Sequence, residues 1–419
     1  MTDYAENGSC ATSPKKMNFK SFGPGILMAS AAIGGSHLVA STQAGALYGW
    51  QLAIMIVLAN FFKYPFFRFG TEYAYRTGTS LIAGYAKKSR AYLWIYFILS
   101  ILSGMISTGA VALLCATILG YMLPFELSGL VLSVVVMVSA WVMLIAGHFK
   151  VLDNVNKFIV AGLTLTTVIA VFVAAGRPAV VSPEFVAVSP WTLVGLAFIV
   201  QLMGWMPAPL EFSAITSIWT AKKIETDQTN YQQGLLDFNV GYLTSAVLAL
   251  FFLALGVFVQ YGTGNEIPMQ GGAYVGQLIS MYAATIGDWS KLLVAVIAFL
   301  CMFGTTITCA DGYGRANAEC LALIKGSTIN DKSVMAWTTF TVVAGLILIT
   351  FFKGQMGALL KFAMISAFLT APIFAYLNYS LVKTEQKFTP VYHVYILSGL
   401  AFLLGFTVLF LLNFFGAFS

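Results

Sequence analysis

Charged residues are scarce in this sequence. Asp, Glu, Lys and Arg make up 9% of the 419 residues, whereas 59% are hydrophobic and the mean hydropathy is +0.85. A soluble domain carries roughly 25% charged residues. The composition therefore excludes an ordinary soluble domain and predicts many membrane spans, with the lipid bilayer as a partner. The net charge of +6 gives no indication of a nucleic-acid partner.

Cysteines, histidines and catalytic motifs are also few. The five Cys residues include no CxxC pair, so no disulfide framework or metal cluster is indicated. His37, His148 and His393 lie in separate regions, and neither a GxSxG nor a Walker motif occurs. We therefore expect no enzyme activity and no cofactor. Residues 1–20 lack the apolar core of a signal peptide and are expected to form a cytoplasmic tail.

Long hydrophobic segments, in contrast, are abundant. About 20 apolar residues cross a bilayer as a helix. Eleven segments fit this length, at about 23–47, 50–75, 91–122, 127–147, 154–175, 191–220, 234–260, 288–323, 333–352, 356–382 and 390–415. The predicted fold class is an all-α membrane protein with 11 transmembrane helices.

Lys and Arg are distributed unevenly between the connecting segments. With the N-terminus placed inside, the outer segments hold only Arg177, Lys291 and Lys353. The inner segments hold Lys15, Lys16, Lys20, Arg76, Lys87, Lys88, Arg90, Lys150, Lys157, Lys222, Lys223, Arg315, Lys325, Lys332, Lys383 and Lys387. This asymmetry predicts a multi-pass protein of the cell (inner) membrane with a cytoplasmic N-terminus and an outside C-terminus. We expect a monomer.

The first and sixth segments each contain helix-breaking residues. Gly34-Gly35-Ser36-His37 interrupts the first, and Gly204 to Pro209 interrupts the sixth with two prolines that lack N–H groups. Lipid cannot satisfy the freed backbone groups, so such breaks occur where the backbone lines a cavity. Two broken helices at matching places indicate the central site of a transporter. Two unrelated kinks in packed helices are the alternative.

The position of the breaks divides the chain into two halves. Each half starts with a broken helix and has five helices, and an odd number per half inverts the second half relative to the first. The expected parts are the tail 1–20, a first repeat 21–180, a second repeat 181–385, and the last helix with the C-terminus, 386–419.

Several motifs resemble those of the NRAMP family of metal-ion transporters. The first segment and the turn RTGTSL at residues 76–81 are similar to the family's first helix and the turn after its second. MGWMPAP at residues 203–209 lies where the family has Ala-x-x-Met-Pro-His, and residues 303–321 resemble its eighth helix. The resemblance covers nearly the whole chain and implies a leucine-transporter-type five-plus-five inverted repeat followed by an eleventh helix.

The metal-binding motif of that family is replaced here. Its Asp-Pro-Gly-Asn aligns with Gly34 to His37, its Met is kept as Met206, and the His that follows is Ala208. A second family His aligns with Ser213. The acidic residues that the family uses for protons are absent, because no Asp or Glu occurs between Glu72 and Glu126. We expect the fold to transfer, but not the metal substrate or the proton path.

A small anion suits the predicted site better than a metal ion. Helix N-termini near Ser36 and Pro207 would present free N–H groups, and Ser36 and His37 would add donors. A divalent cation would find no carboxylate to offset its charge. The predicted substrate-binding residues are Gly34, Gly35, Ser36, His37, Met203, Gly204, Met206 and Pro207. A packing role for His37 is the alternative reading.

These residues predict secondary-active uptake of a small anion, most plausibly bicarbonate. An anion entering a cell that is negative inside moves uphill, so a coupling cation is expected. In other transporters of this fold, hydroxyls of the eighth helix and carbonyls of the first hold sodium. The resemblance therefore suggests a Na⁺ site formed by Ala32, Ile33, Thr305, Thr306 and Thr308. Hydrogen bonds from these Thr residues within their own helix are the alternative.

Three functional classes remain open from the sequence. The first is the sodium-coupled anion importer. The second is a divalent metal transporter (Mg²⁺, Mn²⁺ or Fe²⁺) of altered selectivity, and the third is a sensor or channel, which the short tails disfavour. Other charged residues lie within spans. Glu211 and Asp311 are further site candidates, and Arg68 is expected to pair with Glu72. Lys63, Arg68 and Lys361 are assigned no role in transport.

Overall fold

The computed structural model describes residues 23–147, 149–178, 181–265, 267–268 and 271–417. The predicted tail 1–20 lies outside these residues. The described part is built of helices. Their bounds are α1 Pro24–Ala32, η2 Ser36–Ser41, α2 Thr42–Tyr48, η3 Gly49–Leu52, α3 Ala53–Thr77, α4 Leu81–Lys88, α5 Arg90–Met122, α6 Gly129–Ile145, α7 Phe149–Ala175, α8 Leu193–Gly204, α9 Phe212–Asp227, α10 Tyr231–Val259, α11 Gly271–Ile286, α12 Ser290–Lys325, α13 Asp331–Phe351, α14 Met356–Glu385 and α15 Pro390–Phe414.

The eleven predicted spans all correspond to helices. By length and composition, eight stretches of the described residues can cross a membrane, and α6 and α8 are shorter apolar helices. The crossings are α1 with η2 and α2, then α3, α5, α6 and α7, followed by α8 with α9, then α10, α12, α13, α14 and α15. Each half therefore begins with a discontinuous helix, as the sequence predicts.

Both predicted breaks are present, with slightly different bounds. The first covers Ile33 to Gly35, and a π-helical turn, Ser36–Ser41, follows it. Hydroxyls then bond carbonyls in the wider turn: Ser41 Oγ donates to Ser36 O at 3.0 Å, and Thr42 Oγ1 to His37 O at 3.1 Å. The second break covers residues 205–211 and contains a cis Met206–Pro207 bond.

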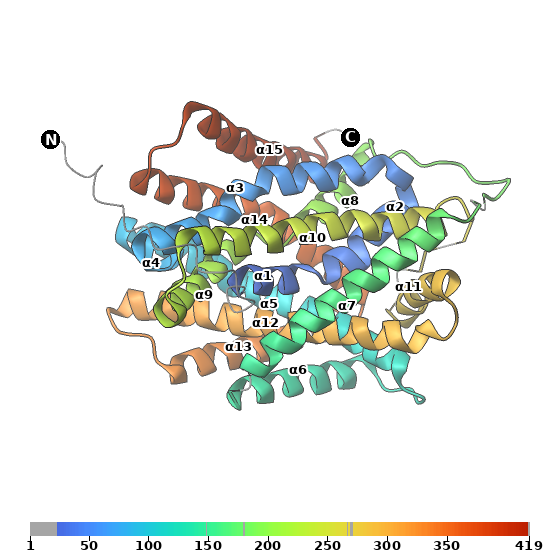
Figure 1. The fold of residues 1–419 in the computed structure, drawn as a ribbon, viewed down its shortest axis with the longest axis horizontal. Helices are drawn as coiled ribbons and strands as arrows, with labels where there is room; N and C mark the ends of the chain where they lie inside the picture. Colours follow the sequence, from blue (N-terminus) through green and yellow to red (C-terminus); the bar gives the residue numbers. More distant parts are fainter. Residues whose placement is uncertain (1–22, 148, 179–180, 266, 269–270, 418–419) are drawn as a thin grey trace.

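Two helices were not predicted. The short helix α4 follows the RTGTSL turn and starts with Ser80, whose Oγ accepts from Ala83 N. The other, α11, lies between the seventh and eighth crossings. Each is shorter than a span, so a search for membrane-length apolar segments passes over it. In Figure 1, α4 and α9 lie at one end of the bundle and α11 lies at the other.

Close helix contacts surround the discontinuous helices. The first half-helix, α1, packs on α10, where the Asp237 carboxylate accepts from Gly23 N at 3.1 Å and Gly25 N at 2.8 Å. A carboxylate at this place satisfies N–H groups that have no partner inside the helix. At the second break, Gly204 lies directly on the backbone of α14: a Cβ there would lie 1.8 Å from Met364 O.

This contact predicts that Gly204→Ala strongly destabilises the protein, because neither backbone can give way without moving a helix. We expect a loss of at least about 2 kcal/mol of unfolding free energy. Gly405→Ala is the matched control, since a Cβ there meets nothing within 4 Å. The measurement is thermal unfolding of both purified variants in detergent. Equal stability of the two would contradict the close packing of α8 on α14.

Candidate functional site

A small cavity lies where the two breaks meet. Its lining comes from Ala31, Ala32, Gly35, Ser36, Ser107, Val111, Trp205, Pro207, Ala208, Pro209, Phe212, Thr305 and Cys309. None of these described lining residues is charged. The space open to the centre of a water-sized sphere is about 20 Å³, which is room for about one water molecule. The cavity is therefore small in this conformation.

Side-chain donors lie next to the carbonyls at the end of α1. Thr305 Oγ1 lies 3.2 Å from Ser30 O, and Cys301 Sγ lies 2.9 Å from Ile33 O. Ser36 Oγ lies 2.7 Å from Ala32 O. These contacts come mainly from α12, which crosses beside the break. The arrangement gathers several backbone oxygens next to one hydroxyl, Thr305, which also lines the cavity.

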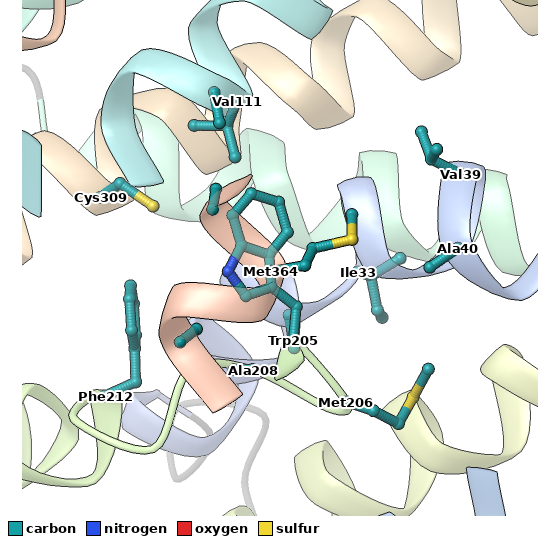
Figure 2. Packing of buried hydrophobic residues seen from close by; sticks show 14 of the residues in the cluster. Ile33, Val39, Ala40, Val111, Trp205, Met206, Ala208, Phe212, Cys309 and Met364 are labelled. Atoms are coloured by element: carbon teal, nitrogen blue, oxygen red, sulfur yellow. The ribbon is translucent and has the colours of Figure 1, made fainter. Parts of the chain in front are cut away.

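The backbone on the other side of the first break presents N–H donors rather than carbonyl acceptors. In the described part of the chain, the N–H groups of Gly35 and Ser36 donate to no backbone carbonyl. The indole Nε1 of Trp205 is buried and likewise has no partner among the described atoms. In Figure 2 the Trp205 ring lies between Val111 and Ala208 at the centre of the cluster. Several residues that line the cavity therefore carry N–H groups without a partner among the described atoms.

His37 does not face the cavity. Its Nε2 lies 2.8 Å from Ser245 O on α10, its Nδ1 lies 2.7 Å from Ser36 Oγ, and its ring packs edge-on against Phe252. A carbonyl only accepts, so Nε2 carries the proton and Nδ1 accepts from Ser36 in the neutral ring. The expectation that His37 donates to a substrate does not fit this conformation, because both nitrogens are used in packing.

The second break differs from its prediction in where its second half-helix starts. That helix, α9, begins at Phe212 rather than near Pro207, and its first amides bond locally: Phe212 N to Pro209 O and Ser213 N to Leu210 O, both at 3.1 Å. Glu211 precedes the helix and is fully buried, with Oε1 2.9 Å from the Tyr313 hydroxyl. Ala208 N of the second break, on the cavity lining, likewise donates to no backbone carbonyl among the described residues, so both breaks contribute amide donors.

Lys63 occupies the end of α8. Its Nζ lies 2.6 Å from Met203 O and 3.0 Å from Gly204 O, and the residue has no exposed surface. These are the final carbonyls of α8; Met203 O also accepts from Met206 N at 3.3 Å, whereas Pro207 has no N–H to donate. Met203 and Gly204 were predicted to bind the substrate, but their backbone oxygens already accept from the Lys63 ammonium group.

The remaining predicted residues divide into two groups. Gly35, Ser36 and Pro207 line the cavity, and Gly34 lies against Thr305, where a Cβ would be 3.2 Å from Oγ1. Met206 is buried but does not line the cavity. Thr306 and Thr308 donate to Met302 O and Gly304 O of their own helix, both at 2.8 Å. Thr305 Oγ1 also lies 3.0 Å from Cys301 O of its own helix, but it is the one of the three Thr residues that reaches α1, at Ser30 O.

The charged candidates form local pairs. Asp311 accepts from Arg315 at 2.7 Å, away from the cavity lining. Arg68 and Glu72 pair at 2.8 Å, as predicted from their spacing. Lys361 is exposed. Among the described residues, no group of three or more His, Cys, Asp or Glu side chains could hold a metal ion.

Sequence reasoning missed most of the apolar lining and, above all, Trp205. Ser107, Val111, Phe212 and Cys309 come from three different helices, so only the packed structure brings them together. Trp205 did carry a signal, because it stands inside the predicted break. An indole N–H buried without a partner at such a place indicates a donor available to a ligand.

Known proteins support the fold. No family model matches the sequence. A manganese transporter mutant from Eremococcus coleocola superposes with a TM-score of 0.70 at 15% identity, covering 95% of this chain and 88% of that chain. Mhp1, a nucleobase-cation-symport-1 family transporter, superposes with a TM-score of 0.62 at 15% identity, covering 88% of this chain and 81% of that chain.

The structural likeness confirms the leucine-transporter-type fold predicted from the sequence, with helices 1 and 6 broken. A relative in sequence is also known. An uncharacterized protein of Pasteurella multocida is 50% identical over 398 residues, which are 94% of this chain and 92% of the relative. At this identity and coverage, the chain belongs to the same protein family as the uncharacterized Pasteurella multocida protein.

Proposed function

We propose that this protein is a secondary-active transporter of a small anion, with bicarbonate as the first candidate, coupled to Na⁺ by alternating access. The observation that carries the proposal is the set of unused donors at the cavity: the N–H groups of Gly35 and Ser36 and the Trp205 indole N–H. A small planar oxyanion has acceptors in several directions and can engage all three. The absence of charge in the described lining leaves no carboxylate there to repel it.

Charge around the cavity also favours an anion. The Lys63 ammonium is buried at the second break, and the half-helix after the first break contributes a positive partial charge of roughly half an elementary charge. Glu211 is the opposing carboxylate, and Tyr313 donates to it. The small cavity holds about one water molecule, so the anion enters when the half-helices open the cavity to one side.

Uptake of an anion into a cell that is negative inside costs about 2.3 kcal/mol per 100 mV. A cation moving inward supplies this energy. The end of α1 provides a place for it: Thr305 Oγ1 lies by Ser30 O, and the carbonyls of Ala32 and Ile33 lie next in the chain. When the Ser36 hydroxyl gives its single proton to His37, Ala32 O keeps a lone pair for Na⁺.

A divalent metal ion is the competing substrate. The sequence resemblance to the NRAMP family suggests it, and so does the fold shared with a manganese transporter. The donors oppose it. Such ions prefer carboxylate oxygens, and the described lining offers only backbone groups, hydroxyls and one thiol near Trp205.

The deciding experiment is uptake of labelled bicarbonate and of labelled manganese into proteoliposomes that contain the purified protein. We expect bicarbonate to accumulate when an inward Na⁺ gradient is imposed, and much less with choline in its place. Manganese should not accumulate, and calorimetry should detect no micromolar manganese binding. Manganese uptake without bicarbonate uptake would overturn the proposal in favour of the metal transporter.

The first variant places a carboxylate at the break. Gly34→Asp should abolish bicarbonate uptake, because its charge repels the anion and its oxygens compete for the N–H donors. Gly34→Asn has nearly the same shape without the charge, and it meets the same Thr305 contact. Uptake should therefore survive in part in Gly34→Asn. Equal uptake by the two variants would show that the anion does not bind at this break.

The second variant tests the indole donor. Trp205→Phe keeps an aromatic ring in the cavity and removes the N–H, so uptake at low substrate should fall by about tenfold, which is one lost hydrogen bond of roughly 1.5 kcal/mol to a charged group. Trp219→Phe is the control, because Trp219 Nε1 is also buried without a described partner but does not line the cavity. Initial uptake rates over a range of bicarbonate concentrations distinguish the two.

The third comparison tests the cation site. Thr305→Val keeps the side-chain shape and deletes the hydroxyl that faces Ser30 O, so half-maximal uptake should require severalfold more Na⁺. Thr306→Val removes a hydroxyl bonded within its own helix and should leave the Na⁺ requirement unchanged. Uptake is measured against Na⁺ concentration at fixed pH. A shift of the same size in both variants would place the cation elsewhere.

A further inference from the structure

Lys63 is a buried charge whose position the proposed transport function does not explain. It lies in the middle of α3, eleventh in a helix of 25 residues, and has no exposed surface. A lysine at membrane depth is costly to keep and is retained where its charge is needed. No described carboxylate lies within ion-pair distance of it, although Glu211 acts on it electrostatically. Its direct partners are of another kind.

Those partners are the last carbonyls of α8 and one aromatic ring. The Nζ atom lies 2.6 Å from Met203 O, 3.0 Å from Gly204 O and 5.9 Å from the centre of the Phe368 ring. The carbonyls point out of the C-terminal end of a half-helix, where the helix dipole is negative. Phe368 adds the negative face of its ring from α14. Together they form a three-sided cage for a cation.

In transporters built from broken helices, this kind of place binds a diffusible ion, because the C-terminal ends of half-helices and unwound carbonyls coordinate Na⁺. In this chain an ammonium group on α3 fills the cage. We propose that Lys63 is a tethered cation: it occupies a cation site at the end of α8, so that this break needs no bound ion of its own.

The proposal explains why the chain keeps this residue in spite of its burial. Gly204 lies against Met364 O on α14, so the end of α8 is fixed from that side by backbone contact. Lys63 fixes it from α3 by donating to both of its final carbonyls. The inference goes beyond the proposed function, because it concerns a second cation position and does not depend on which substrate the protein carries.

The test uses the thermal stability of the purified full-length protein in detergent, without substrate. Lys63→Gln keeps hydrogen-bond donors but removes the charge, and Lys63→Arg keeps the charge. Lys63→Ala opens the space of the side chain, into which a small cation fits. Lys361→Ala is the matched control, since this lysine lies exposed on α14.

We expect Lys63→Ala and Lys63→Gln to lower the unfolding temperature by at least about 4 °C, because two buried carbonyls lose their cation. Lys63→Arg should retain most of the stability, and Lys361→Ala should match the unmodified protein. Millimolar propylammonium should restore at least half of the loss in Lys63→Ala and do nothing in the unmodified protein. Neutral propanol at the same concentration should restore none.

Three results would overturn the proposal. One is equal restoration of Lys63→Ala by propanol and by propylammonium, which would make the side chain a space-filling group. Restoration by neither molecule would likewise overturn it, because the vacated space would then not bind a cation. The third is equal stability of Lys63→Gln and Lys63→Arg, which would show that hydrogen bonding suffices without charge. If Lys63→Ala does not fold, this second comparison decides the question alone.

Discussion

The structure depends on one constraint: a backbone carbonyl freed inside the bilayer must find a donor, because lipid supplies none. The chain meets this demand with side chains from neighbouring helices. Thr305 and Cys301 of α12 cover the end of α1, and Lys63 of α3 covers the end of α8. The same rule applies at the proline within α3. Pro65 lacks the N–H that Phe61 O would use, and the Tyr395 hydroxyl of α15 donates to that carbonyl instead.

The two breaks meet this demand with different donors, neutral at the first break and charged at the second. At the first break the donors are neutral hydroxyls and a thiol, which a cation can displace or join at little cost. At the second break the donor is an ammonium group held by covalent attachment. In the proposed mechanism a cation therefore exchanges at the first break but not at the second. The fixed charge also leaves the centre more favourable for an anion than the carbonyls alone would.

Two ion pairs neutralise most of the other buried charge in the described part, whereas the buried Glu319 accepts a hydrogen bond from Ser80 and has no ion pair there. Arg68 with Glu72 and Arg315 with Asp311 form pairs one helical turn apart, so neither pair imposes a net charge on the centre. Asp237 caps the N-terminus of α1 and thereby holds the N-terminal end of the first half-helix against α10. Lys63 and Glu211 are thus the buried groups whose charge reaches the cavity region, one from each side of the second break.

The sequence by itself determined the eleven spans, the two breaks and the pairing of Arg68 with Glu72. These follow from local causes: the length of apolar segments, the missing N–H of proline, the flexibility of paired glycines and the period of the helix. The resemblance of motifs added the leucine-transporter-type fold, which superposition on solved structures confirmed.

Only the tertiary structure decided which groups face the cavity. His37 and Trp205 stand in comparable breaks, but His37 turns to Ser245 on α10 while Trp205 turns inward. Their directions depend on helices more than a hundred residues away in the sequence. For the same reason the sequence could not separate Thr305 from Thr306 or find the carbonyls beside Lys63. A side chain's partner is set by helix rotation and packing, and neither is encoded in local spacing.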